Sequence, residues 1–348
     1  MGAFDIDAEL GEKPHENEAQ IAHQLAEIIA KAMGEKGAPA RREAHPKAHG
    51  CVMADFHVEE NLPPYLAQGV FMPGKIYQAY IRFSNGRPNP MRADGRRDAR
   101  GMAIKLLGVP GEKILTSERD AQTQDFLMMS HPKFLVNDPT RYLNFTDQWN
   151  KPDRFAKLRA LKALGFKGVL NGIEMTSAII GSPLQARYWS QVPYRLGDSP
   201  HKQAIKFSAK PCILDDMKFY PRKSPNYLRD SMILQLTSIG AKFDFEVQLR
   251  APDMSVEDSM IEWNEAAAPF IKVATITIPC QDFATPERDQ FGENLSFTPW
   301  HALPQHRPLG ITNRIRRVVY ETMSKLRHDI NGTVRREPAG VLADFSNP

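Results

Sequence analysis

The sequence has little of what an exported or membrane-embedded protein carries. Its apolar runs all fall short of the roughly 18 residues that span a bilayer, and residues 1–12 lack the basic and apolar regions of an export signal. We therefore expect a cytoplasmic protein with no integral membrane association.

Cysteine and excess charge are also scarce. The three cysteines, Cys51, Cys212 and Cys280, are odd in number and widely spaced, which fits neither a disulfide framework nor a CxxC-type zinc or redox site. The formal net charge is only +4 in 348 residues. This small excess gives no reason to expect a nucleic-acid partner.

The remaining composition is that of a folded globular protein. Hydrophobic residues make up 42% of the chain and charged residues 25%. At about 150 residues per domain, the length suggests two domains or one large β-rich domain with appendages. After residues 37–42 the sequence changes from a helical pattern to short β-like runs. This change predicts an N-terminal helical extension over residues 1–40 and one main domain over residues 41–348.

The pattern of apolar residues predicts an α+β fold. Helical spacing begins at Asn17 and recurs over residues 152–170 and from Asn313 to about Asn331, whereas residues 283–310 have the composition of a loop. Six β-like runs are separated by Gly, Pro, Asn and Asp: 51–58, 75–83, 102–107, 124–129, 233–250 and 272–279. Half-buried antiparallel strands of this kind are most simply closed as a barrel.

The common motifs of nucleotide-binding and hydrolytic enzymes are missing. No GxGxxG, P-loop, HExxH or GxSxG sequence is present. His301 and His306 could suit a metal, but they have no Cys or acidic companions nearby in the sequence, which favours ordinary surface histidines.

The last predicted helix carries a polar stripe. Arg316 and Tyr320 are four residues apart and Arg327 follows seven later, so all three lie on nearly one side. A guanidinium beside a phenol favours the phenolate, a hard anionic ligand suited to ferric iron. An arginine at the surface with a tyrosine at the edge of the core is the alternative.

Two further segments place polar residues next to predicted strands. Before the first strand, His45 follows Arg42 by three residues and is well placed to project into a barrel mouth. At the end of the second, Ser84 could hydrogen-bond an imidazole and Arg82 could pair with a carboxylate. For residues 97–100 we favour a structural salt-bridge corner.

Together and in this order, these segments resemble the haem catalase family. Residues 42–47 resemble the family's R-x-x-H-x-K segment, 82–84 its RFS strand, 97–105 its RDxRGxAxK segment, and 316–320 its R-x-x-x-Y helix. The arginine that follows the family's tyrosine by seven residues has its counterpart in Arg327. The resemblance implies a catalase-like antiparallel barrel of about eight strands, with helical insertions and a C-terminal helix that carries the proximal ligand.

The resemblance also implies roles for individual residues around a haem b. Tyr320 would be the iron ligand, with Arg316 as its hydrogen-bonding partner, and His45 the distal acid-base group, supported by Ser84. The residues that would hold the propionates or line the haem are Arg42, Arg82, Arg327 and Phe134. Fixed guanidinium groups suit anionic propionates, and a peroxide needs one movable proton.

Departures from the family pattern favour a peroxidase over a fast catalase. Ala121 stands where catalases have a distal Asn, with Gln122 beside it, and Ala44 replaces a Val before the distal His. The chain is also much shorter than a typical catalase. These features fit the small catalase-related branch, which includes peroxidases and the hydroperoxide isomerase allene oxide synthase.

The sequence therefore predicts a haem peroxidase of the catalase-related type. It would reduce hydrogen peroxide or organic hydroperoxides through a ferryl intermediate, with an electron donor that the sequence does not identify. The alternatives are a fatty-acid hydroperoxide isomerase, a weak catalase, and a haem-binding storage or sensor protein without turnover. The resemblance also allows a homo-oligomer.

Overall fold

The computed structural model describes residues 6–151, 153–212 and 224–340. The ends of both predicted units, residues 1–5 and 341–348, and the internal segment 213–223 lie outside the described residues. The helices are α1 (Glu18–Lys36), α2 (Pro139–Asn150), α3 (Ala156–Ser177), α4 (Tyr227–Leu236), α5 (Pro286–Asn294) and α6 (Ile311–Asn331). The strands are β1 (Ala48–Val58), β2 (Ile76–Asn85), β3 (Arg100–Leu107), β4 (Thr123–Met129), β5 (Tyr188–Trp189), β6 (Tyr194–Leu196), β7 (Gln203–Pro211), β8 (Ala241–Leu249) and β9 (Phe270–Ile278).

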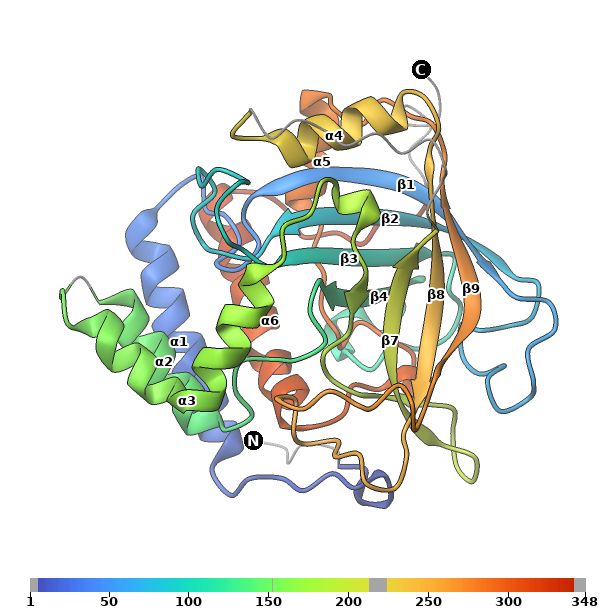
Figure 1. Cartoon of the computed structure of the whole chain (residues 1–348), viewed down its shortest axis with the longest axis horizontal. Helices are drawn as coiled ribbons and strands as arrows, with labels where there is room; N and C mark the ends of the chain where they lie inside the picture. The colour runs from blue at the N-terminus through green and yellow to red at the C-terminus, as the bar shows by residue number, and fades with distance from the viewer. Residues whose placement is uncertain (1–5, 152, 213–223, 341–348) are drawn as a thin grey trace.

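The strands form a closed antiparallel barrel, as the sequence predicted. Their order is β5-β4-β3-β2-β1-β9-β8-β7-β6, and β5 also pairs with β7, which closes a ring of eight strands and leaves β6 as an extra strand beside β7. The seam is short, because β5 offers only Tyr188 and Trp189 to its two neighbours. Figure 1 shows α1, α2, α3 and α6 to one side of the barrel and α4 and α5 above it.

The barrel interior is the main hydrophobic core. Inward residues of β2, β3 and β4, such as Ile81, Ile104 and Phe126, are almost completely buried there. Because side chains alternate across a strand, the residues between them point outward, toward the helices. On β3 and β4 this outward row includes Gly101 and Met129, which pair directly across the ladder.

Helix α6 is anchored at its N-terminal end by buried ion pairs. Arg314 is completely buried and bonds to Glu12, Glu18 and Glu257, with the closest contacts at 2.6 Å. The Glu257 carboxylate also accepts from the backbone N–H of Ile311 at 2.6 Å. Acidic groups at a helix N-terminus are favoured by the helix dipole, so this network fixes where α6 begins.

Helix α1 packs along α6. Their shared apolar cluster consists of Ala22, Leu25, Ile29, Ile311 and Ile315. The predicted N-terminal helix thus covers α6 and holds it near the barrel.

One predicted strand was half wrong, and other elements were missed. Within residues 233–250, the first part belongs to helix α4 and only β8 is a strand. Gly240 makes the turn between them with φ +68°, and a Cβ there would lie 2.6 Å from the Ile278 carbonyl oxygen. Strand β7 had no expectation from the sequence, and helix α5 shows that the loop predicted over 283–310 was wrong in its first part.

Candidate active site

His45 and Ser84 contact each other, as predicted, but on the outer face of the barrel at the end of β2, because Ser84 alternates with the inward Phe83; the predicted position of His45 in the barrel mouth is wrong. The Nδ1 atom of His45 lies 3.0 Å from the Ser84 Oγ atom. The His45 backbone has φ 63°, a left-handed conformation uncommon for a residue other than glycine. Strained backbone of this kind tends to occur at functional sites, where the surrounding structure holds it in place.

Gly101 provides the space for the imidazole. A Cβ at this position would lie 2.5 Å from the His45 Nδ1 atom and 3.0 Å from the Ser84 Oγ atom. Only glycine therefore fits beneath the pair without moving it. Gly101 lies inside the RDxRGxAxK segment, but nothing in the sequence alone indicated that it supports the imidazole.

The His45 imidazole is surrounded by positive charge. Burial, and then the guanidinium groups of Arg82, Arg316 and Arg42 in that order, together lower the pKa of His45 to about 3. The ring is therefore neutral at ordinary pH and able to accept a proton. The same interactions place arginines from β2, from α6 and from the segment before β1 within electrostatic reach of one imidazole.

Arg42, Arg82 and Arg327 converge on the C-terminal end of α5. Arg42 Nη1 lies 3.0 Å and Arg82 Nη2 3.5 Å from the same carboxylate oxygen of Glu293. Arg327 donates to the backbone oxygens of Glu293 and, at 3.1 Å, Leu295. Glu293 had no signal in the sequence, because its role depends on where α5 ends.

This cluster has more positive charge than its acceptors neutralise. Three guanidinium groups face the single carboxylate of Glu293, which leaves a surplus of two positive charges. Burial, and then the charge of Arg42, lower the pKa of Arg82 to about 9 and that of Arg327 to about 10. Within the described residues, the buried Nε and Nη2 atoms of Arg82 make no hydrogen bond. Such a cluster is suited to an anionic ligand carrying two carboxylates.

Tyr320 and Arg316 lie one helical turn apart on α6. The Arg316 guanidinium is 5.3 Å from the centre of the Phe134 ring, and that ring meets Tyr142 edge to face at 5.8 Å. Burial raises the pKa of Tyr142, while Arg316 lowers it and Tyr320 raises it, so these groups lie within electrostatic reach of one another. Phe134, Arg316 and Tyr320 thus form a second group of predicted residues.

Phe134 is held in place through its backbone. Its N–H donates to the Ser259 carbonyl at 2.8 Å, and its own carbonyl accepts from Asn171 of α3 at 3.0 Å.

The outward residues Ala103 and Leu127 of the barrel are partly exposed, in contrast to the inward residues that flank them. Gln122 is exposed in the turn before β4 and has no hydrogen bond to His45 in the described part of the chain.

The structure changes the interpretation of His301 and His306. Both were expected at the surface, but both are buried, and His306 Nε2 accepts from the Val70 N–H at 2.9 Å. His301 Nδ1 lies 2.5 Å from a carboxylate oxygen of Glu118. This acidic partner is far away in the sequence, which is why the sequence could not indicate it.

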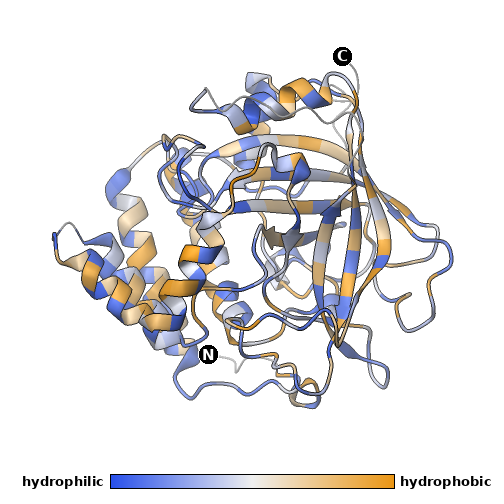
Figure 2. Ribbon diagram, in the orientation of Figure 1, coloured by the Kyte–Doolittle hydropathy of each residue, from blue (hydrophilic) through white to orange (hydrophobic). Residues whose placement is uncertain are grey.

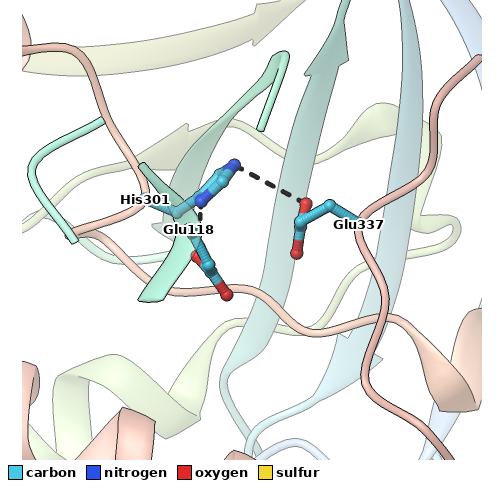
Figure 3. Close-up of side chains that lie close together, drawn as sticks. All are labelled: Glu118, His301 and Glu337. Atoms are coloured by element: carbon cyan, nitrogen blue, oxygen red, sulfur yellow. Dashed lines mark hydrogen bonds and ion pairs between the residues drawn. The ribbon is translucent and has the colours of Figure 1, made fainter. Parts of the chain in front are cut away.

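Glu118, His301 and Glu337 could together present ligand atoms to a cation. One ligand atom from each lies within 4.8 Å of the others, and Figure 3 shows both carboxylates beside the imidazole. However, Lys105 Nζ lies 2.6 Å from Glu337, and Arg335 pairs with Glu118. Lys105 is also 2.7 Å from Asp125. Because each carboxylate of the cluster already pairs with one of the chain's own cations, we interpret the cluster as a structural network that fastens the C-terminal segment to the barrel.

Comparison with known proteins identifies relatives with the same architecture. No family model matches the chain. A curated protein named catalase-related peroxidase, from Mycolicibacterium paratuberculosis, is 25% identical over 285 residues, which is 78% of this chain and 85% of that protein.

Solved catalase structures share the fold. Catalase A from Saccharomyces cerevisiae aligns with a TM-score of 0.63 at 16% identity, covering 92% of this chain and 73% of that one. A bacterial catalase aligns with a TM-score of 0.65 at 15% identity, covering 95% and 64%. A fungal catalase gives 0.63 at 16%, covering 82% and 59%. The chain thus spans between about three fifths and three quarters of the length of these catalases.

In the described residues, no helix is both long and apolar enough to cross a membrane.

Proposed function

We propose that the chain is a haem-dependent peroxidase of the small catalase-related branch of the catalase superfamily, acting on hydrogen peroxide or organic hydroperoxides, because its curated relative is named catalase-related peroxidase and solved catalases share its fold. The observation that carries the proposal is the surplus of two positive charges where Arg42, Arg82 and Arg327 face Glu293. The two propionates of a haem b carry the two negative charges that this cluster needs.

The residues of the second group fit the rest of a haem. Tyr320 would hold the iron through its phenolic oxygen, and Arg316, one turn away on the same side of α6, would place a positive charge beside it. The Phe134 ring offers an apolar face beside them. Bound haem supplies the redox chemistry, since the iron and porphyrin take up the oxidising equivalents of a peroxide and pass them to a donor.

His45 is the group that moves the proton. Its Nδ1 atom is engaged with Ser84, so Nε2 remains for the substrate. A neutral imidazole can take the proton from one peroxide oxygen and return it to the other, which makes water or an alcohol the leaving group. Gly101 and Ser84 position the ring for this transfer.

Titration of the purified chain with haemin tests the proposal. We expect an absorption spectrum typical of ferric haem with a tyrosinate ligand, and its loss or strong weakening in Tyr320→Phe. The matched control is Tyr65→Phe, whose ring is exposed and belongs to neither group. A chain that gives no Soret band with haemin, or a Tyr320→Phe spectrum identical to the wild type, contradicts the proposal.

Turnover then separates the enzyme from a passive haem carrier. His45→Ala should retain haem and lose peroxide turnover, whereas unchanged peroxide reactivity would favour a storage or sensor protein. Assays in parallel with hydrogen peroxide, an alkyl hydroperoxide plus an electron donor, and a fatty-acid hydroperoxide distinguish catalase, peroxidase and isomerase activity.

A further inference from the structure

Helix α3 exposes apolar side chains that no part of the described chain covers. Seven of the fifteen large hydrophobic residues exposed in the described regions fall within residues 155–179. Phe166 is the most exposed of them, at 81%, and with Leu170 (41%) and Ile173 (51%) it follows the i, i+4, i+7 spacing of one helix side. Scattered apolar residues are normal on a surface, but a concentration of this kind marks an interaction site.

The inner side of α3 is already occupied. Ala160, Leu164 and Asn171 are buried, and a Cβ at Gly168 would lie 2.8 Å from the Leu135 carbonyl oxygen. The helix therefore packs closely on the segment that carries Phe134. Its apolar outer side is additional to this packing. Figure 1 shows the first part of α3 at the edge of the molecule and the second part running from there toward the barrel.

Basic residues are interleaved with the exposed apolar ones. Residues 151–178 contain six Lys or Arg and two Asp or Glu, a net charge of +4 that equals the charge of the whole chain. Lys162 is exposed beside the apolar Leu161 at the end of the first part of α3. The non-helical backbone of Gly165, with φ 70°, kinks the helix there, and Phe166 begins the second part. Some of the cations have local partners, such as Lys167 with Asp258 at 3.9 Å, but the segment as a whole keeps a positive excess.

This combination excludes some partners on physical grounds. A second copy of the same face would bring two positive excesses together, and like charges across an interface cost binding energy. An apolar helix side flanked by Lys and Arg is instead the composition of helices that lie in the plane of a bilayer, with the charges at anionic headgroups. Figure 2 shows apolar and polar residues alternating along α3.

We propose that α3 docks the protein on the surface of an anionic lipid bilayer. Phe166, Leu170 and Ile173 enter the headgroup region, and Lys162 and its basic neighbours pair with lipid phosphates. The contact is peripheral, since no helix of the described chain could span the membrane. Docking needs neither haem nor turnover, so its test is independent of the proposed function.

Co-flotation with lipid vesicles tests the docking. The full chain should float with vesicles of phosphatidylglycerol and phosphatidylcholine in equal parts, float much less with phosphatidylcholine alone, and be released by added salt. Failure of the wild type to float with the anionic vesicles overturns the proposal.

Two variants of the α3 face and two matched controls make the test specific. The double variant Phe166→Ser with Leu170→Ser should bind at least about tenfold more weakly, and Lys162→Glu about tenfold. The controls are Ile76→Ser, at 55% exposure on β2, and Lys325→Glu, whose side chain is 77% exposed on α6. Equal losses in variants and controls contradict docking through α3.

Measurement of the protein's size in solution tests whether a second copy of the chain covers the α3 face instead of a bilayer. A wild type that is dimeric, fails to float, and becomes monomeric in the Phe166→Ser, Leu170→Ser variant would show that this face joins two copies, and the proposal would be wrong. Because the substituted side chains are exposed, we expect the thermal unfolding of these variants to match that of the wild type.

Discussion

The substitution Gly101→Ala should displace the imidazole of His45 while leaving the rest of the site intact. The added Cβ would lie 2.5 Å from Nδ1 and 2.6 Å from Cε1 of that ring. Non-bonded carbon atoms are most favourable at about 3.5–4.0 Å, so the ring must move by roughly 1 Å. The Ser84 Oγ atom, 3.0 Å from the same Cβ, limits the directions in which the ring can move.

The expected loss of activity is large compared with the loss of stability. A misplacement of about 1 Å can cost about 10²-fold in rate, and overpacking a buried site costs about 1–3 kcal/mol. We therefore expect peroxide turnover to fall about 10²-fold in Gly101→Ala. Haem affinity should stay near the wild-type value, because the arginine cluster at Glu293 is unchanged.

The assay compares single-turnover rates with peroxide, haem titration and urea unfolding for each variant. Gly34→Ala is the matched control, because a Cβ at Gly34 of α1 meets no atom within 4 Å. It should keep full turnover and gain about 0.5–1 kcal/mol of stability from the better helix propensity. If Gly101→Ala turns over peroxide as fast as the wild type while His45→Ala does not, the support assigned to Gly101 is refuted.

Three other perturbations give directional results. Arg82→Ala should weaken haem binding about 10²-fold, yet stabilise the haem-free chain, because it removes a buried cation beside Arg42. Haem titration measures the first effect and urea unfolding the second. A variant that loses both haem affinity and haem-free stability would contradict the charge surplus. Burial lowers the pKa of His306 to about 3, so the residue stays neutral in the folded state and the free energy of unfolding falls as the pH drops below about 6.5. Urea unfolding at pH 7 and pH 5 should show a loss of about 2 kcal/mol from this residue, which should be absent in His306→Leu. A free energy of unfolding that rises on acidification would contradict this. Glu12→Gln removes a partner of the fully buried Arg314 and should cost about 3 kcal/mol in urea unfolding, with Glu9→Gln, exposed in the same segment, as the neutral control.

The barrel was predictable because its strands carry local signals. Most of the predicted β-runs coincide with β1–β4, β8 and β9, where apolar alternation and turn residues occur together. Strand β7 was missed although Ile205 and Phe207 alternate with the polar Lys206 and Ser208, which is the pattern of a half-buried strand. The run over 233–250 was wrong in its first part because apolar residues of a buried helix and of a buried strand look alike until Gly240 is seen as a turn.

The candidate site was predictable only in part. The order of the short catalase-like segments in the chain was enough to predict that His45 lies near Ser84 and that the three arginines belong to one site. Glu293 and Gly101 were not found, because a counter-ion and the absence of a Cβ are defined by packing between distant segments. The environment of His301 was missed for the same reason.

The short seam of the barrel has a consequence for local dynamics. Strand β4 meets β5 through the single residue pair Met129 and Trp189, and β5 meets β7 through two pairs. Few hydrogen bonds must break there, so amide hydrogen exchange should be fastest along this line of the ring. The chain from β4 leads directly into the loop that carries Phe134. Transient opening of the seam would therefore allow the Phe134 ring to move, while the strands on the opposite side of the barrel stay paired.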